Sequence, residues 1–102
     1  MLKAEFKKLS KAEQETLLNW CRNIGKRKTI NKGRTSYSLK HIFERSKSGF
    51  YITNDVFKEA MLKVGFNYEF VDNKGVNWCF NYSEKSLKEI IKNDENLKES
   101  YK

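Results

Sequence analysis

In four stretches of the chain, apolar residues recur every three or four positions, the period of a helix with one buried face. The first stretch starts at residues 10–13, Ser-Lys-Ala-Glu, which have the spacing of a capping box. It predicts a helix over residues 11–24, ended by Gly25 in the left-handed conformation. Thr35 or Ser36 can cap a second helix that runs to about residue 46, and a short strand over residues 50–52 follows it.

Two further helices are predicted in the second half of the chain. Thr53 or Asn54 caps a helix with one apolar face, which ends at Gly65. Ser83 caps a last helix of the same kind. The remaining tail, residues 94–102, is polar, and we expect it to fray.

Alternating apolar and polar positions predict a β-hairpin between these two helices. Its strands fall in residues 66–71 and 76–82, and the turn sequence Asp-Asn-Lys-Gly joins them at residues 72–75. Aromatic side chains at alternate positions give one apolar sheet face, which the helices are expected to cover. Core packing is therefore favoured for the hairpin aromatics over stacking on nucleic-acid bases. Only Tyr51, Tyr82 or one edge aromatic is left for a ligand.

The predicted elements form one α+β domain over residues 1–102, with an exposed, mobile basic arm at residues 26–34. The order helix, basic connection, helix, short strand, helix, hairpin is that of a winged helix with an added terminal helix. In this fold the third helix recognises nucleic acid and the hairpin is the wing. The chain has 102 residues, of which 38% are apolar, and it lacks a long apolar run. We therefore expect no membrane contact and a cytoplasmic location.

Motifs in the middle of the chain resemble those of two known families. Residues 51–54, Tyr-Ile-Thr-Asn, together with Gly65 and Trp78, resemble the winged-helix module that closes virus-type primase-helicases. Residues 36–41, Ser-Tyr-Ser-Leu-Lys-His, and 49–54, Gly-Phe-Tyr-Ile-Thr-Asn, resemble small uncharacterised proteins of bacterial phages, plasmids and integrative elements. The second resemblance implies a mobile-element setting, and it transfers no catalytic or binding residue.

The positive charge of the chain is concentrated in residues 22–47. The whole chain carries 21 Lys and Arg against 13 Asp and Glu, a net charge of +8. This segment holds nine of the basic residues, and Glu44 is its one acid, so it accounts for the whole excess. Phosphate contacts that do not read sequence are expected from Arg22, Lys26, Arg27, Lys28, Lys32, Arg34 and Lys40. The alternatives are a solvated loop that serves solubility and a surface for an acidic protein partner.

Further nucleic-acid contacts are expected from the third helix and the hairpin turn. Asn54 and Lys58, near the start of that helix, are candidates for reading bases or phosphates, and Lys74 is a candidate phosphate contact of the wing. Asp55 and Glu59 on the same exposed face would repel phosphates. Two interpretations of this helix face therefore remain open: it reads a DNA groove, or it is only solvated.

The sequence gives no sign of catalytic or metal chemistry. Cys21 and Cys79 lie inside predicted elements without metal-ligand spacing, which favours buried free thiols. His41 stands alone on the flank of the second helix, as a surface or boundary residue does. We therefore expect no catalytic residues, no cofactor and no metal, and not an enzyme.

These patterns favour a small mobile-element DNA-binding protein that contacts phosphates through a basic arm, in transcriptional control or replication. DNA is favoured over RNA as the partner. The alternative is a phage-type modulator or inhibitor that binds a host protein or defence complex. A homodimer formed by pairing of exposed hairpin edges is a third reading.

Overall fold

The helices begin at the caps that the sequence predicts. In this computed structural model, which describes residues 5–100, a 3-10 turn η1 (Phe6–Lys8) precedes α1 (Lys11–Arg22). Ser10 and Glu13 form the capping box of α1, with reciprocal N–H···O bonds of 3.0 and 3.1 Å. Side-chain hydroxyls of Thr35, Thr53 and Ser83 accept from the first turns of three more helices: α2 (Ser36–Arg45), α3 (Asn54–Lys63) and α4 (Glu84–Asn93).

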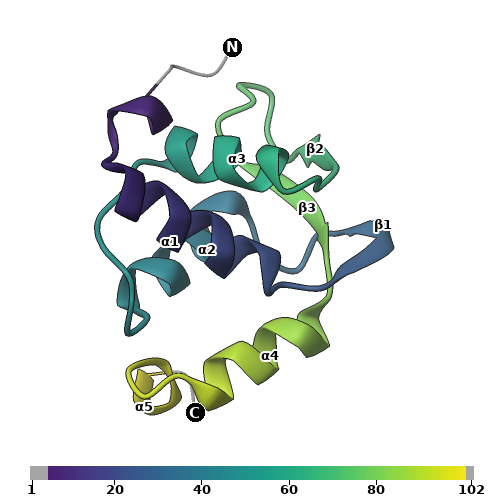
Figure 1. The fold of residues 1–102 in the computed structure, drawn as a ribbon. Helices are drawn as coiled ribbons and strands as arrows, with labels where there is room; N and C mark the ends of the chain where they lie inside the picture. Colours follow the sequence, from purple (N-terminus) through teal and green to yellow (C-terminus); the bar gives the residue numbers. More distant parts are fainter. Residues whose placement is uncertain (1–4, 101–102) are drawn as a thin grey trace.

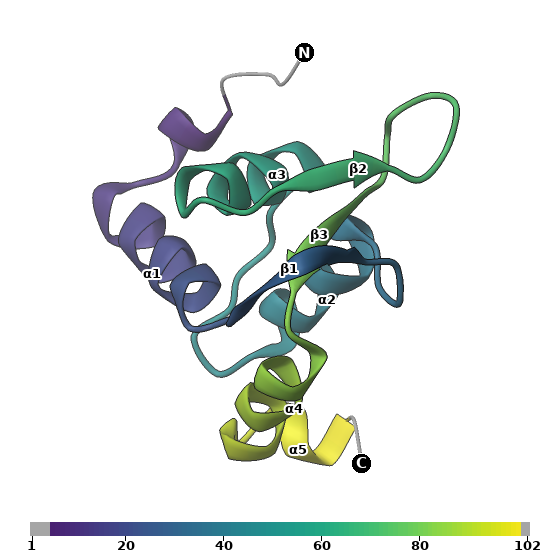
Figure 2. The ribbon, with the colours of Figure 1, turned by 90° about the vertical axis from the view of Figure 1, so that its right-hand side faces the viewer.

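The strands form one small antiparallel sheet beside these helices (Figures 1 and 2). Its order is β1-β3-β2, with β1 at Lys26–Asn31, β2 at Tyr68–Phe70 and β3 at Trp78–Tyr82. Strands β2 and β3 pair in regular register and make the predicted hairpin, whose loop projects beyond the helices in Figure 2. The predicted α+β class is therefore confirmed for residues 5–100.

The prediction of a mobile basic arm at residues 26–34 is wrong for most of its length. Residues 26–31 are strand β1, which pairs with β3 through a register shift between Lys26 and Asn31. The Asn81 side chain donates a 2.9 Å hydrogen bond to the Arg27 carbonyl in the irregular part. The basic side chains therefore project from a hydrogen-bonded edge strand rather than from a loop.

Two smaller predictions at chain reversals are also wrong. Residues 50–52 form no strand; there the Ile52 N–H donates to the Glu44 carboxylate at 3.0 Å, so a side chain takes the place of a strand partner. Gly25 does not adopt the left-handed conformation, and its N–H donates to Ser86 Oγ at 2.7 Å. Gly65 does end its helix as predicted, at a φ of +92°.

The core lies where α1 and α2 pack on α3 and where α2 packs on β3. Aromatic rings meet edge to face through this core, from Trp20 on α1 through Phe43 and Phe57 to Phe80 on the central strand. The side chains of Phe43, Phe57 and Phe80 are fully buried. Large aromatic residues thus tie the sheet to the three helices that cover it.

The hairpin aromatics divide into two groups. Phe66, Trp78, Phe80 and Tyr82 are buried, as predicted for a covered sheet face, although this overturns Tyr82 as a residue left over for a ligand. Tyr68 and Phe70 of β2, together with Tyr51 in the α2–α3 connection, are instead solvent-exposed. The sheet extends past the helices at β2, and the expectation of core packing fails at these two strand residues.

The C-terminal segment is ordered over residues 94–100, so the predicted fraying is wrong there; Tyr101 and Lys102 lie outside the described residues. Asp94 accepts N–H bonds from Asn96 and Leu97, which start the short helix α5 (Leu97–Ser100). The Leu97 side chain is fully buried. One apolar residue in a polar stretch therefore docks this segment.

Shortening this residue tests the docking. We expect Leu97→Ala to lower the free energy of unfolding by about 2 kcal/mol, since a buried leucine is replaced by a cavity that a short terminal helix can partly close. Urea denaturation followed by circular dichroism measures it. The exposed neighbour serves as the control, and Lys98→Ala should leave the midpoint unchanged.

Candidate nucleic-acid interface

Most of the predicted phosphate-binding residues lie on or beside β1. Lys26, Arg27 and Lys28 are exposed on the strand itself, and Lys32 is exposed just after it. Arg22, at the end of α1, is also exposed, and it donates a 2.7 Å hydrogen bond to Asn19 Oδ1. The structure thus brings these five predicted residues to the edge strand and the helix end that leads into it.

Two of these cations are held in position by their neighbours. The Arg27 guanidinium folds back on the strand and donates to the carbonyls of Thr29 and Ile30 at 3.0 and 3.1 Å. These bonds use two of its five N–H donors and leave a fixed cation at the surface. The Lys26 ammonium lies 4.6 Å from the centre of the Phe66 ring, a cation–π contact that anchors the base of the strand.

Arg34 is engaged inside the protein. Its guanidinium donates two parallel hydrogen bonds to the Glu84 carboxylate, at 3.0 and 2.9 Å, so its charge is neutralised in place. This pair ties the segment after β1 to the first turn of α4. The Arg34 hydrogen bonds hold the pKa of Glu84 below its ordinary value of 4.5. Arg34 therefore positions α4, a role that the sequence analysis did not foresee.

The Arg34–Glu84 pair makes stability depend on pH. Because the folded protein lowers the pKa of Glu84, the pair stabilises the fold above the ordinary value of 4.5 and the effect is lost as the pH falls through the lowered pKa. Glu84→Gln should therefore lower the urea midpoint at neutral pH, and the difference from the parent should disappear once the pH is below the lowered pKa of Glu84. The control Glu89→Gln, on the same helix but exposed, should show no such difference at either pH.

Lys40 does not reach the surface as the sequence analysis expected. Its side chain is buried, and its ammonium lies 2.9 Å from Glu44 Oε2 and within 5.4 Å of the ring centres of Tyr37 and Tyr51. His41 approaches the other Glu44 oxygen at 3.3 Å. Glu44 is thus the centre of a structural cluster, and its carboxylate neutralises the Lys40 charge. In the sequence it counted only as one acid among nine bases.

The third helix differs from its prediction in the same way. Lys58 is 3% exposed rather than solvated, and the hairpin covers it. The Asn54 amide group donates to the Val76 carbonyl at 3.0 Å and to Asn77 Oδ1 at 3.2 Å, which fastens α3 to the hairpin. Of the three residues predicted in this region, Lys74 alone is exposed, at the hairpin turn.

Helix α4 adds three cations that the sequence analysis missed. Lys85, Lys88 and Lys92 are exposed and stand at i, i+3 and i+7, on one stripe of the helix. The first turn of α4 lies beside the start of β1, since the Ser83 N–H donates to the Gly25 carbonyl at 2.8 Å. Counting charge along the chain hid these lysines among nearby acids, whereas their helical spacing would have revealed them.

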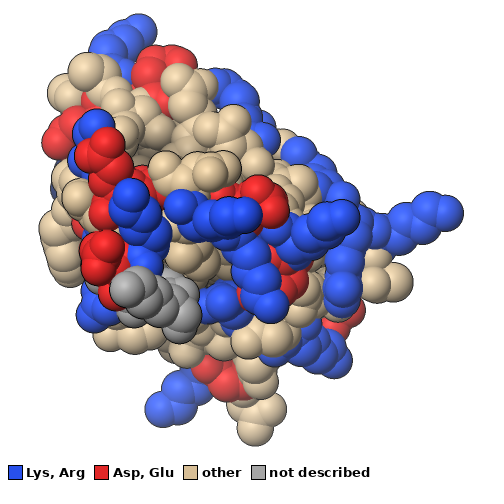
Figure 3. Space-filling model, turned by 90° about the horizontal axis from the view of Figure 1, so that it is seen from below, with Lys and Arg blue, Asp and Glu red and all other residues tan. Residues whose placement is uncertain are grey.

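We call the exposed cations of the α1 end, β1 and α4 the basic surface: Arg22, Lys26, Arg27, Lys28, Lys32, Lys85, Lys88 and Lys92. Viewed from the end of the molecule where α4 and α5 lie, Lys and Arg side chains crowd the face, with smaller acidic areas between them (Figure 3). Within residues 5–100, no carboxylate lies within 4.0 Å of the side-chain nitrogens of Lys28, Lys85 or Lys88. These charges remain available to an external anion.

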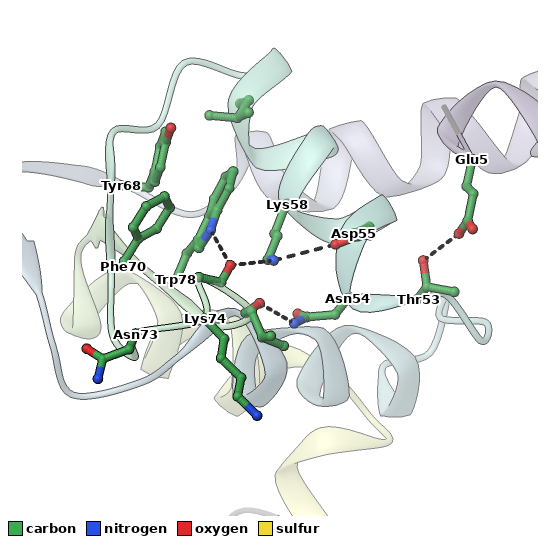
Figure 4. A pocket seen from close by; sticks show the side chains of 13 residues that line it. Glu5, Thr53, Asn54, Asp55, Lys58, Tyr68, Phe70, Asn73, Lys74 and Trp78 are labelled. Atoms are coloured by element: carbon green, nitrogen blue, oxygen red, sulfur yellow. Dashed lines mark hydrogen bonds and ion pairs between the residues drawn. The ribbon is translucent and has the colours of Figure 1, made fainter. Parts of the chain in front are cut away.

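A groove of about 840 Å³ lies between α3 and the hairpin (Figure 4). Asp55, Lys58 and Leu62 line it from the helix, and aromatic residues of β2 and β3 line it from the other side. Tyr68 stacks on Trp78 with ring centres 3.9 Å apart and planes 14° apart. The expected DNA-reading helix therefore faces an aromatic groove rather than open solvent.

The cysteines and the histidine occupy the positions expected from the sequence. Cys21 and Cys79 are free and buried, and burial raises the pKa of each thiol above its ordinary value, which keeps both thiols protonated. His41 is a boundary residue with 38% of its side chain exposed. Among the described residues, no three His, Cys, Asp or Glu side chains gather in a way that could hold a metal ion.

Comparison with known proteins gives no match: no family model, no curated protein and no solved structure is significantly similar to this chain. Over residues 5–100, none of the helices combines the length and the apolar character needed to cross a bilayer. Function must therefore be argued from the basic surface and the groove themselves.

Proposed function

We propose that this chain is a winged-helix-like DNA-binding protein that holds duplex DNA by its phosphates through the basic surface. The order α1, β1, α2, α3, β2, β3, with β1 and β2 both paired to β3, supports a winged-helix arrangement in which β1 replaces the expected connection. The resemblance of residues 36–41 and 49–54 to mobile-element proteins favours a cytoplasmic role in the control or replication of such an element.

The observation that carries the proposal is the basic surface. Among the described residues, Arg22 lies 4.0 Å from Glu15 and Lys32 lies 3.8 Å from Glu69, while the other six cations of the surface have no carboxylate within 4.0 Å. These six repel one another, and a structural role does not require them to gather at one edge strand and one helix stripe. A polyanion relieves that repulsion and releases its own counterions on binding. The surface holds Arg as well as Lys, so both guanidinium groups, which can donate two parallel hydrogen bonds, and single ammonium groups face the phosphate oxygens.

The proposal places the duplex away from the outer face of α3. Lys58 is buried and the Asn54 amide group is occupied, while Asp55 and Glu59 would repel phosphates there. We therefore expect no base-specific contacts from α3 to duplex DNA. Binding through phosphates alone predicts weak dependence on DNA sequence and strong dependence on salt.

Fluorescence anisotropy of a labelled duplex over a salt series tests this function. With about five phosphate contacts, the logarithm of the association constant should fall with the logarithm of salt concentration with a slope of about −4.5. Duplexes of different sequence should give nearly the same slope. Absent binding, or binding that salt does not weaken, would overturn the proposal.

A further inference from the structure

Four exposed apolar side chains lie together on the outer face of α3 and on the hairpin. They are Leu62, Tyr68, Phe70 and Val76, and all four line the groove between α3 and the hairpin. Apolar area left in water costs roughly 25 cal/mol per Å², and the core is complete without these residues. A concentration of this kind marks a binding surface.

The groove between α3 and the hairpin is the concave part of this surface, and flat aromatic rings form one of its walls. Phe70 is 63% exposed and Tyr68 is 41% exposed. The Tyr68 ring is stacked on Trp78, and the Phe70 ring lies 5.9 Å from Tyr68 and 6.2 Å from Trp78, tilted against both (Figure 4). The Trp78 indole N–H donates to the Gly75 carbonyl at 3.1 Å, which holds the Trp78 ring in position. The groove thus has an aromatic platform that is held in position yet faces solvent.

A buried ammonium lies behind this platform, because Tyr68 stacks on one face of Trp78 and Lys58 lies over the other. Lys58 Nζ is 3.4 Å from the Gly75 carbonyl and 3.5 Å from Asp55 Oδ1, both longer than a well-formed N–H···O bond, and 4.8 Å from the Trp78 ring centre. Its side chain is 4% exposed, so these loose contacts are all that offset the loss of water. Asn54 also lines the groove, but its Oδ1 atom is buried and has no hydrogen-bond partner. The Lys58 ammonium is therefore engaged inside the protein, and the exposed rings of the platform are what the groove offers to the stacking face of a nucleobase.

Charge decides how a nucleic acid would lie. Asp55 and Glu5 line the groove, so phosphates are repelled from its interior. The exposed Lys74 stands on the rim, where a backbone phosphate would pass (Figure 4). Bases inside and phosphates at the rim require unpaired nucleotides, because the stacking faces of bases in a duplex are already covered.

We infer that the groove between α3 and the hairpin binds unpaired bases of single-stranded DNA, stacked on the exposed rings of Phe70 and Tyr68, with a backbone phosphate at Lys74 on the rim. This inference rests on the proposed function, since the basic surface supplies the phosphate attraction that brings the strand to the protein. It adds a second mode, in which the protein holds a duplex by the basic surface and an adjoining single strand by the groove.

The test measures single-strand and duplex binding separately. Labelled oligothymidylate of about 10 nucleotides, which fits one small single-strand site, and a duplex of equal length are titrated with the parent protein and with Phe70→Ala. Phe70→Ala should weaken oligothymidylate binding about 5- to 100-fold, the loss of one stacked base, and should change duplex affinity less than about twofold. Phe70→Tyr keeps the ring and should retain single-strand binding. The matched control is Val71→Ala, exposed on the same hairpin but outside the groove, and it should also retain that binding.

The outcomes separate this inference from the proposed function. Oligothymidylate affinity that is equal in Phe70→Ala and Val71→Ala, with duplex binding intact, would overturn the groove inference alone and leave the groove to a protein partner. Equal weakening of duplex and single strand by Phe70→Ala would also overturn it, because the ring would then not distinguish the two. Absent binding to both nucleic acids would overturn the inference and the proposed function together.

Discussion

A triple variant of the basic surface, Lys28→Gln with Lys85→Gln and Lys88→Gln, should bind duplex DNA about 10- to 100-fold more weakly than the parent near 0.1 M salt. The three lysines are exposed and, within the described residues, lie beyond 4.0 Å from any carboxylate. Each phosphate contact that is removed should flatten the plot of log affinity against log salt by about 0.9. Anisotropy titrations at several salt concentrations measure both effects.

The matched control changes the net charge equally at a distant place. Lys7, Lys8 and Lys11 are exposed on η1 and at the start of α1, at the opposite end of the molecule from α4 (Figure 1). Replacing these three by glutamine should leave the salt slope unchanged, because charges beyond a Debye length of about 10 Å at 0.1 M are screened. Equal weakening by the two triple variants would mean that overall charge, and not the basic surface, attracts the DNA.

The second large effect concerns stability. Phe80→Ala should lower the free energy of unfolding by about 3–5 kcal/mol, the range for a phenylalanine removed from a packed core. The Phe80 side chain is fully buried on the central strand and meets the rings of Phe57, Phe66 and Trp78 at 6.2–6.4 Å. Since small domains are stable by only about 5–15 kcal/mol, the variant should be close to unfolding at 37 °C. Guanidinium or urea denaturation gives the value.

The same substitution elsewhere on the hairpin provides the control. Phe70→Ala removes an equal side chain that is 63% exposed, and we expect a loss of about 1 kcal/mol or less. Because its expected loss of unfolding free energy is small, Phe70→Ala should stay folded and is a suitable probe of the groove. Similar losses in the two variants would contradict the assignment of Phe80 to the core and of Phe70 to a binding surface.

Local signals in the sequence predicted the helix caps and the hairpin. The side chains of Ser10, Thr53 and Ser83 accept from N–H groups three residues away, and the turn at residues 72–75 joins strands adjacent in the chain. Such interactions are fixed by short stretches of sequence. The caps and the hairpin therefore appear where the sequence places them, whereas the aromatic alternation did not reveal that β2 extends past the helices.

Strand β1 could not be predicted because its partner is distant in the chain. The Asn81 side chain satisfies the Arg27 carbonyl across 54 positions, and cations in the strand conceal any apolar alternation. Sheet propensity depends strongly on such tertiary neighbours. For the same reason a dense basic run was interpreted as a mobile arm.

The candidate site was predictable only in part. The concentration of charge at residues 22–47 led correctly to exposed cations on β1, but two of its members, and Lys58 on α3, have structural roles or partners that appear only in three dimensions. Lys40 is neutralised by Glu44, Arg34 by Glu84, and Lys58 is covered by the hairpin. The lysines of α4 are interspersed with acids along the chain, and their stripe becomes visible only when charge is counted around the helix.

The location of duplex binding tests the central claim most directly. Titration of ¹⁵N-labelled protein with an unlabelled duplex, followed through its amide resonances, reports which elements meet the DNA. The account predicts shifts over β1 and along α4, with η1 and the start of α1 unchanged. Shifts confined to α3 and the hairpin turn would contradict it, because the duplex would then lie on the aromatic face instead of the basic surface.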